Sequence, residues 1–298
     1  MFNKLIVALM PLAPRFIIKM VSKRYIAGED TAAAMAACKR LKAQGFLTTV
    51  DILGESVTTD GQAREARDSY LELINIVTEN QIEKNISLKP TALGLALSAD
   101  LAFDYISAIV KKAHESGVFI RIDMENSPYT DKTLEFYERL SGQYPGLGTV
   151  IQAYMHRSMD DVTKIAARGG NLRICKGIYK ESPSIAYQNA EEIRRNYLKL
   201  VREMLVQGAY VGIATHDQYL IDETVKLIAE LKISPDKYEF QALLGVPIDK
   251  RLEALVAAGH KVRIYVPFGS EWYAYSSRRL KENPDVAGYV LKNIFVKN

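Results

Sequence analysis

Short β-rich runs alternate with amphipathic helical stretches along most of the chain, and this alternation restricts the fold more than any other feature. Eight runs have the length of a buried strand, at residues 46–53, 85–90, 118–125, 148–155, 171–177, 209–217, 238–245 and 260–269. Most of the stretches between them carry apolar residues at three- and four-residue spacing, and Gly117 marks the expected end of one helix. Strands and helices that alternate in this way form parallel β–α–β units.

Eight such units predict a closed (β/α)8 barrel of the TIM type, which takes about 250 residues. The chain has 298 residues, so the barrel fits once the first part is set aside. We expect residues 1–44 to form an N-terminal helical segment packed on the barrel, and residues 45–298 to form the catalytic barrel. An open, doubly wound sheet is the alternative, but neither a G-x-G-x-x-G motif after the first strand nor a P-loop supports it.

The first residues, MFNKLIVALMPLAPRFIIKM, mix apolar and basic side chains. Pro11 and Pro14 interrupt the apolar run, which is shorter than the roughly 20 residues of a membrane-spanning helix. A basic helix on a membrane surface and a helix packed on the domain both remain open. The net charge of +4 is spread among acidic residues, which argues against nucleic-acid binding. Cys38 and Cys175 lie far apart, as expected for reduced thiols in the cytoplasm.

Polar residues occupy most of the predicted strand ends, where a barrel of this type places its active site. Strand interiors are expected to hold branched aliphatic residues instead. The polar strand ends include Lys89, Asp123, Gln152, Arg173, Lys176, His216, Gln241 and Tyr265. One charged residue at a strand end is commonly part of a loop ion pair. A ring of them predicts a small-molecule site, and its cations favour anionic ligands.

The residue types at the strand ends limit the chemistry. Lys89 or Lys176 could form a Schiff base, as in barrel aldolases. Asp123 and Glu125 alternate along a strand and face opposite sides, so they do not form a carboxylate pair for glycoside hydrolysis. His216 has no histidine partner, so no metal site is predicted.

A helix is expected after the last strand, and it carries two adjacent arginines. At about 100° per residue, Tyr275, Arg278, Arg279 and Glu282 share one face of this helix. The simpler interpretation is a solvent-exposed network of ion pairs that adds little to the stability of the fold. Because this helix follows the last strand, the pair would lie beside the barrel mouth, where two guanidinium groups braced by Glu282 suit a carboxylate ligand.

Eight short stretches, taken in their order along the chain, resemble the proline dehydrogenase family. They are SLKP, IDME, IQAY, RICKGIY, ATHD, EFQALLG, RIYVPFG and YAYSSRRLKEN. The resemblance runs from Arg24 over nearly the whole remaining chain and is weakest over the first 20 or so residues. It implies a monofunctional bacterial flavoenzyme that oxidises L-proline to 1-pyrroline-5-carboxylate in the first step of proline catabolism. Hydride would pass from proline C5 to N5 of FAD, and electrons would pass on to a quinone.

The resemblance also implies roles for single residues. Substrate contacts are expected from Lys89, Tyr179, Leu243, Tyr265, Tyr275, Arg278, Arg279 and Glu282. FAD contacts, without a Rossmann domain, are expected from Met124, Gln152, Arg173, Lys176, Gly177, Ile178, Thr215, His216 and Gln241. Asp123 and Arg173 are the implied catalytic residues, with Asp123 hydrogen-bonded to Lys89. Asp217 stands where the family commonly has asparagine, and we leave it out of the predicted site.

The expected partners are L-proline, a membrane quinone and a separate 1-pyrroline-5-carboxylate dehydrogenase. The expected location is the cytoplasm, with the basic N-terminus available for peripheral contact with the inner face of the cell membrane. Hydroxyproline is the alternative substrate. A Schiff-base aldolase and a ligand-binding barrel without catalysis are the alternative functions.

Overall fold

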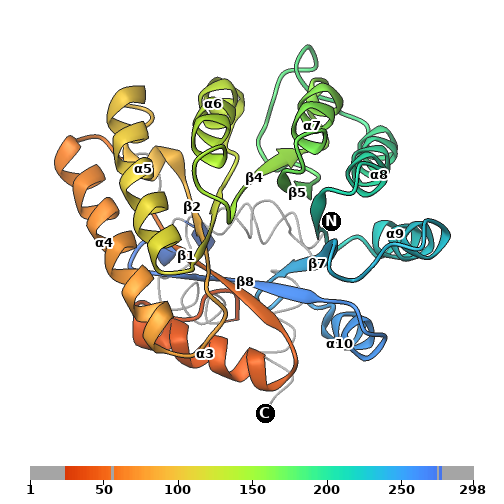
Figure 1. The fold of residues 1–298 in the computed structure, drawn as a ribbon, viewed down its shortest axis with the longest axis horizontal. Helices are drawn as coiled ribbons and strands as arrows, with labels where there is room; N and C mark the ends of the chain where they lie inside the picture. The colour runs from red at the N-terminus through yellow and green to blue at the C-terminus, as the bar shows by residue number, and fades with distance from the viewer. Residues whose placement is uncertain (1–23, 55–56, 274, 277–298) are drawn as a thin grey trace, which may run out of the picture.

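A closed ring of eight parallel strands forms the centre of the computed structural model (Figure 1). The structure describes residues 24–273, apart from residues 55 and 56, together with residues 275 and 276. The strands are β1 (Leu47–Ile52), β2 (Asn85–Leu88), β3 (Phe119–Ile122), β4 (Leu147–Gln152), β5 (Asn171–Cys175), β6 (Tyr210–Ala214), β7 (Tyr238–Leu243) and β8 (Val262–Phe268). Pairing of β1 with β8 closes the ring, which confirms the predicted barrel and excludes the doubly wound sheet.

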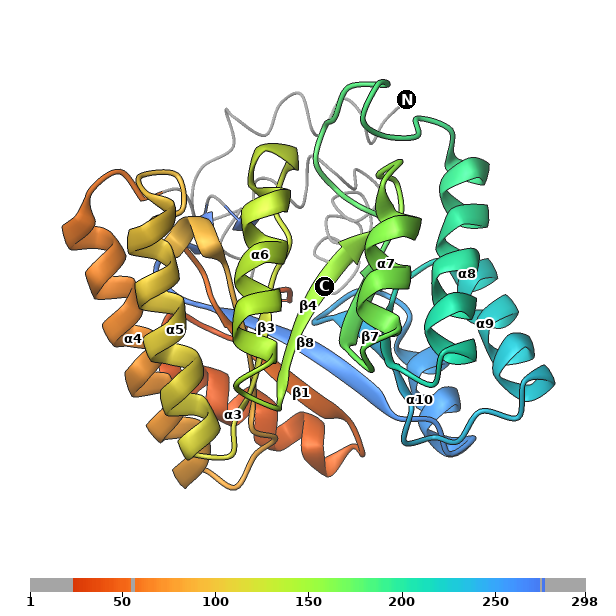
Figure 2. The same cartoon turned by 45° about the horizontal axis from the view of Figure 1, so that its top comes forward.

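Helices follow the strands and cover the outside of the ring (Figures 1 and 2). They are α4 (Asp60–Glu79), α5 (Ala99–Glu115), α6 (Thr130–Ser141), α7 (Ser158–Ala166), α8 (Ala190–Val206), α9 (Gln218–Glu230) and α10 (Asp249–Ala257), with short 3-10 turns η2 (Pro90–Leu93) and η3 (Ser127–Tyr129). Before β1, α3 (Thr31–Ala43) packs on β1 and β8 and lies within residues 24–44, the described part of the predicted N-terminal segment. No helix within these described ranges is long and apolar enough to cross a membrane.

Local sequence signals explain where the helices begin and end. At the start of α4, Thr59 accepts a hydrogen bond from the Gln62 backbone at 3.3 Å, and the Gln62 side chain accepts one from the Thr59 backbone at 3.2 Å. This reciprocal pair is a capping box, which satisfies two backbone donors at the helix start. At the other end of an α–β unit, α5 ends at Glu115 and Gly117 takes a φ of +65°, a left-handed conformation that glycine adopts without strain.

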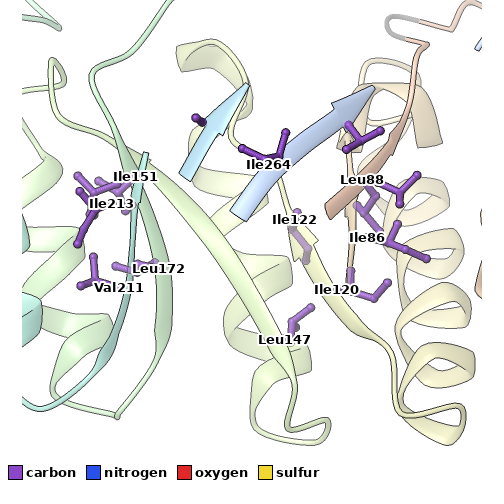
Figure 3. Close-up of a cluster of buried hydrophobic side chains, with 14 of the residues drawn as sticks. Ile86, Leu88, Ile120, Ile122, Leu147, Ile151, Leu172, Val211, Ile213 and Ile264 are labelled. Carbon is purple, nitrogen blue, oxygen red and sulfur yellow. The ribbon is translucent and has the colours of Figure 1, made fainter. Parts of the chain in front are cut away.

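The main hydrophobic core lies between the strands and the surrounding helices. Every second residue of a strand contributes to it, as the period of two requires. Figure 3 shows part of this layer, with Ile86, Leu88, Ile120, Ile122, Leu147, Ile151, Leu172, Val211, Ile213 and Ile264 labelled. Each of these side chains is at most 5% exposed, so they hold the ring and its helices together.

The intervening strand residues fill the lumen, and here the structure differs from the expectation of branched aliphatic residues. Buried charged side chains in the lumen include Asp51, Arg121, Arg173, Glu239 and Arg263. Arg173 of β5 reaches Ser87 of β2 at 3.1 Å, and a hydrogen bond between non-neighbouring strands must cross the lumen. Glycine makes room for these long side chains, since a Cβ at Gly148 would lie 2.8 Å from Nη1 of Arg121.

Candidate active site

A cavity of about 600 Å³ opens at the carboxyl ends of the strands. Every predicted site residue in the described part of the chain lines it: Lys89, Asp123, Met124, Gln152, Arg173, Lys176, Gly177, Ile178, Tyr179, Thr215, His216, Gln241, Leu243, Tyr265 and Tyr275. The remaining three, Arg278, Arg279 and Glu282, lie outside the described residues. A volume of this size suits a ligand of cofactor dimensions.

A second, larger space of about 750 Å³ lies between α6 and α7 on the outer wall of the barrel. Its charged residues pair with one another across the groove, Arg157 with Asp131 and Arg168 with Glu138. It contains no residue from the carboxyl end of a strand. The cavity at the strand ends is therefore the candidate active site, in spite of its smaller volume.

Lys89 lies in a buried ion cluster beside this cavity. Its Nζ donates to both carboxylate oxygens of Asp51 at 2.8 Å, and to the hydroxyl of Tyr265 at 3.2 Å. Lys89 and Asp123 form an ion pair at 3.9 Å but not the predicted hydrogen bond, because the Asp123 carboxylate accepts hydrogen bonds from Arg173 and Tyr265 instead. Asp51 was missed, although a carboxylate at the end of the first strand is the signal that would have found it.

Asp51 is wholly buried at the end of β1. Burial raises the pKa of its carboxyl to about 6; Lys89 opposes this rise and Asp123 adds to it. The Asp51 carboxyl is therefore ionised at neutral pH, although its buried surroundings favour the protonated form. Lys89 supplies the compensating positive charge.

Arg173 is fixed by three hydrogen bonds inside the barrel. Nε donates to Gln241 at 2.6 Å, Nη1 to Asp123 at 2.7 Å and Nη2 to Ser87 at 3.1 Å. Its guanidinium also lies 5.1 Å from the centre of the Tyr265 ring. Burial first, and Asp123 second, raise the pKa of Tyr265, so its hydroxyl stays protonated and donates to Asp123 at 2.9 Å. One carboxylate thus orients both an arginine and a tyrosine that line the cavity.

On another wall of the cavity, Gly177 brings its backbone close to the ring of Tyr154. Gly177 has a φ of +106°, and an added Cβ would lie 2.2 Å from Cδ1 of Tyr154. Both the left-handed conformation and the contact require glycine. Gly177 therefore lets the loop after β5 pack against Tyr154 where this loop lines the cavity.

Asp217 lines the same cavity, although it is outside the predicted site. Its Oδ2 accepts hydrogen bonds from Lys176 at 3.1 Å and from Arg194 at 2.8 Å. Burial alone would raise the pKa of Asp217, but Arg194 and Lys176 hold it below its ordinary value. Asp217 and Arg194 are thus two residues that the sequence interpretation did not include.

Backbone groups that can only donate or only accept a hydrogen bond fix the tautomer of His216 and the amide orientation of Gln152. The backbone N–H of Leu243 donates to Nε2 of His216 at 2.9 Å, so Nε2 is unprotonated and a neutral ring carries its proton on Nδ1. The side-chain amide of Gln152 donates to the backbone oxygen of Glu125 at 2.9 Å. Its carbonyl oxygen is then the end of the amide left to accept a hydrogen bond from a ligand.

The chemistry of these side chains fits a flavin dinucleotide. Lys176 and Arg194 supply cations that suit a diphosphate, and the backbone at Gly177 permits close approach. The carbonyl oxygen of Gln152 suits a ring N–H, and the positive charge of Arg173 suits an electron-accepting ring. Within the described ranges, no three or more His, Cys, Asp or Glu residues are grouped so as to hold a metal ion.

Comparison with known sequences identifies relatives along most of the chain. Residues 34–292 match the family model described as proline dehydrogenase. Proline dehydrogenase 1 of Bacillus subtilis subsp. natto is 35% identical over 279 residues, which cover 94% of this chain and 92% of that protein. A proline dehydrogenase of Deinococcus radiodurans is 34% identical, with 92% of this chain and 90% of that protein covered.

A solved structure shows the same architecture. The crystal structure of proline utilization A (PutA) from Bdellovibrio bacteriovorus, inactivated by N-propargylglycine, superposes with a TM-score of 0.82 at 26% sequence identity. The match covers 89% of this chain and 32% of that chain. The barrel described above therefore corresponds to about a third of the PutA chain.

Proposed function

The chain belongs to the proline dehydrogenase family, and we propose that it oxidises L-proline to 1-pyrroline-5-carboxylate with FAD as the bound oxidant. The buried cluster at the strand ends carries this proposal. Lys89, Asp51, Asp123, Arg173 and Tyr265 are joined by hydrogen bonds of 2.7–3.2 Å beside a cavity of suitable size. A rigid, charged and largely buried cluster of this kind is what positioning an amino acid requires.

The described residues that we propose for substrate and for cofactor line the same cavity. We assign Lys89, Tyr179, Leu243, Tyr265 and Tyr275 to the proline pocket. Arg278 and Arg279 are proposed to clamp the proline carboxylate, with Glu282 as their brace; this part of the proposal rests on the sequence. The FAD contacts are assigned to Met124, Gln152, Arg173, Lys176, Gly177, Ile178, Thr215, His216 and Gln241.

The protein side chains would bind, orient and bias the protonation of the substrate. FAD, when bound, would supply the acceptor for a hydride from proline C5. Lys89 keeps a positive charge beside the cavity because it is paired with Asp51. A cation near an amine favours the neutral form of that amine, which is the form able to release hydride. Arg173, held by Asp123, supplies positive charge where negative charge would gather.

The proposed electron acceptor is a membrane quinone, and the proposed partner for the product is a 1-pyrroline-5-carboxylate dehydrogenase. We also propose a cytoplasmic location, with peripheral membrane contact through the basic N-terminus. We propose a boundary near residue 44 between the N-terminal segment and the barrel. These proposals are supported by the family membership and by the composition of residues 1–20.

An absorbance spectrum recorded before and after adding L-proline tests the function. The purified protein should show flavin absorbance, and proline should bleach it in the absence of oxygen. A protein that oxidises proline without flavin would refute the cofactor, and a flavin that proline does not bleach would refute the substrate. Comparing kcat/KM for L-proline and 4-hydroxyproline separates the two substrates.

A Schiff-base aldolase is the second function to test, because two lysines line the cavity. Lys89 donates to a carboxylate at 2.8 Å, and a Schiff base forms from a neutral amine. We therefore expect no covalent lysine adduct after borohydride treatment with a carbonyl substrate. Mass spectrometry of the treated protein would reveal one.

A further inference from the structure

A chain of buried hydrogen bonds leads from Arg173 at the cavity down to Glu239 deeper in the barrel. Gln241 joins the two, since its Oε1 accepts from Arg173 Nε at 2.6 Å and its Nε2 donates to Glu239 Oε1 at 2.6 Å. All three side chains are at most 7% exposed. Gln241 was predicted to bind the cofactor, but both ends of its amide are engaged inside the protein.

The two hydrogen-bond partners of Gln241, Arg173 and Glu239, fix the orientation of its side-chain amide. The Nε of Arg173 can only donate a hydrogen bond, and the carboxylate of Glu239 can only accept one. The carbonyl oxygen of Gln241 must therefore face Arg173, while its NH2 group faces Glu239. A carboxylate at position 239 is what excludes the reverse orientation, in which the NH2 group of Gln241 would point at an arginine.

Glu239 is itself anchored on the side away from Gln241. Arg263 donates to Oε1 at 2.7 Å through Nε and to Oε2 at 2.9 Å through Nη2, and it also donates to the backbone oxygen of Thr48 at 2.6 Å. Burial alone would raise the pKa of Glu239, but Arg263 and Arg121 hold it below its ordinary value. Glu239 is thus a fixed negative charge at neutral pH.

A strand glycine provides the space for this connection. Arg173 is in register with Gly212 of β6, and Gly212 is in register with Glu239 of β7. A Cβ at Gly212 would lie 2.5 Å from Nε2 of Gln241. The position between the two charged residues therefore has no side chain, and the amide of Gln241 lies there instead.

We propose that Glu239 is a positioning residue that holds Arg173 in its active orientation through Gln241. The proposal rests on the proposed function in one respect, that Arg173 acts on the bound proline and FAD. Glu239 is not among the residues that line the cavity. Its effect on the reaction passes through the Arg173 Nε hydrogen bond.

Two variants separate this effect from a general loss of stability. Glu239→Asp keeps the charge but shortens the side chain by one methylene, which removes the reach to Gln241. Gln241→Met keeps the volume and the Glu239–Arg263 pair but removes the amide. Asp161→Asn is the matched control, because it breaks a carboxylate–arginine pair with Arg157 on the outer wall.

The first readout is solvent exchange of the Arg173 Nε proton, followed by ¹⁵N NMR in the FAD-loaded protein and assigned with Arg173→Lys. We expect exchange to be about tenfold faster or more in both test variants and unchanged in the control. The second readout is steady-state kinetics with proline, where kcat should fall by about ten- to a hundredfold with little change in KM.

Wild-type exchange, or wild-type kcat, in both Glu239→Asp and Gln241→Met would overturn the proposal. If Glu239→Asp does not fold, Glu239→Gln takes its place, because it removes the negative charge and leaves Gln241 unchanged. A wild-type protein that binds FAD but leaves proline unchanged would refute the proposed function. The exchange measurement would then still show whether Glu239 holds Arg173.

Discussion

Replacing Asp51 with asparagine should remove a loss of stability that the wild type shows between pH 4 and pH 7, and should weaken the activity. The Asp51 carboxyl is wholly buried, and its pKa is raised from 3.8 to about 6 by burial, against the opposing effect of Lys89. At pH 7 the folded protein therefore carries a carboxylate that its surroundings disfavour. Asparagine has nearly the same shape and does not ionise.

The magnitude follows from the pKa difference. About two pKa units correspond to about 3 kcal/mol, because one unit is worth roughly 1.4 kcal/mol. Between about pH 4 and pH 6 the folded state binds more protons at Asp51 than the unfolded state does, so the free energy of unfolding falls as the pH rises through this window and stays level above it. The Asp51→Asn protein lacks this fall.

Chemical denaturation at pH 4 and at pH 7, with the same saturating FAD, measures the effect. From pH 4 to pH 7, the free energy of unfolding of the variant should rise relative to that of the wild type by about 3 kcal/mol. Asp217→Asn is the matched control. The pKa of Asp217 is lowered below 3.8, so its carboxyl is ionised in the folded protein and mostly ionised in the unfolded protein from pH 4 to pH 7, and the control should change little relative to the wild type over this range.

Activity should change in the other direction. Lys89 would lose the carboxylate that accepts both of its 2.8 Å hydrogen bonds, and kcat/KM for proline should fall by about tenfold or more. A variant that lacks the pH-dependent loss of stability and is less active is the expected result at a strained functional site. If Asp51→Asn instead loses stability relative to the wild type between pH 4 and pH 7, the carboxylate is not strained and the reasoning is refuted.

Three further predictions concern the cofactor side of the cavity. Gly177→Ala should destabilise the protein by at least about 2 kcal/mol and release FAD, because Gly177 has a φ of +106° and the added Cβ would lie 2.2 Å from Tyr154. Thermal unfolding measures the stability, and the content of bound flavin measures the release. Lys176→Ala should weaken FAD binding by about tenfold in a fluorescence titration, with the KM for proline unchanged. In ¹⁵N NMR spectra, a neutral His216 should carry its proton on Nδ1, and a proton on Nε2 would contradict the hydrogen bond from Leu243.

The barrel was predictable because its signal is local. Each strand is a short run with its own period, so the run at 46–53 already indicates β1 at Leu47–Ile52. The cavity lining was predictable for a related reason. Parallel strands bring their carboxyl ends to one face, and residues such as Lys89 and His216 follow those ends.

The contents of the lumen were not predictable from the same pattern. Alternation along a strand separates the residues that face the helices from those that face the lumen. It does not predict that the lumen-facing residues include several charged side chains. Arg263 and Glu239 are neighbours only because β7 and β8 pair in one particular register. Gly212 lies inside a strand, so no turn explains why glycine is needed there. The explanation comes from the structure, in which Gln241 of another strand fills the space that a side chain at position 212 would take.

The partner of Lys89 shows why sequence motifs did not predict which side chains hydrogen-bond to each other inside the site. The register of β2 and β3, Leu88 with Ile122, places Lys89 and Asp123 level with each other, so a direct hydrogen bond was a reasonable expectation. Arg173 competes for the same carboxylate and binds it at 2.7 Å, while Asp51 binds Lys89 at 2.8 Å. In this arrangement Lys89 gives its hydrogen bonds to Asp51 and stays 3.9 Å from Asp123, whereas moving those hydrogen bonds to Asp123 would leave the wholly buried Asp51 without its charged partner. Because such an unpaired buried charge costs several kcal/mol, the alternative pairing is the less stable one.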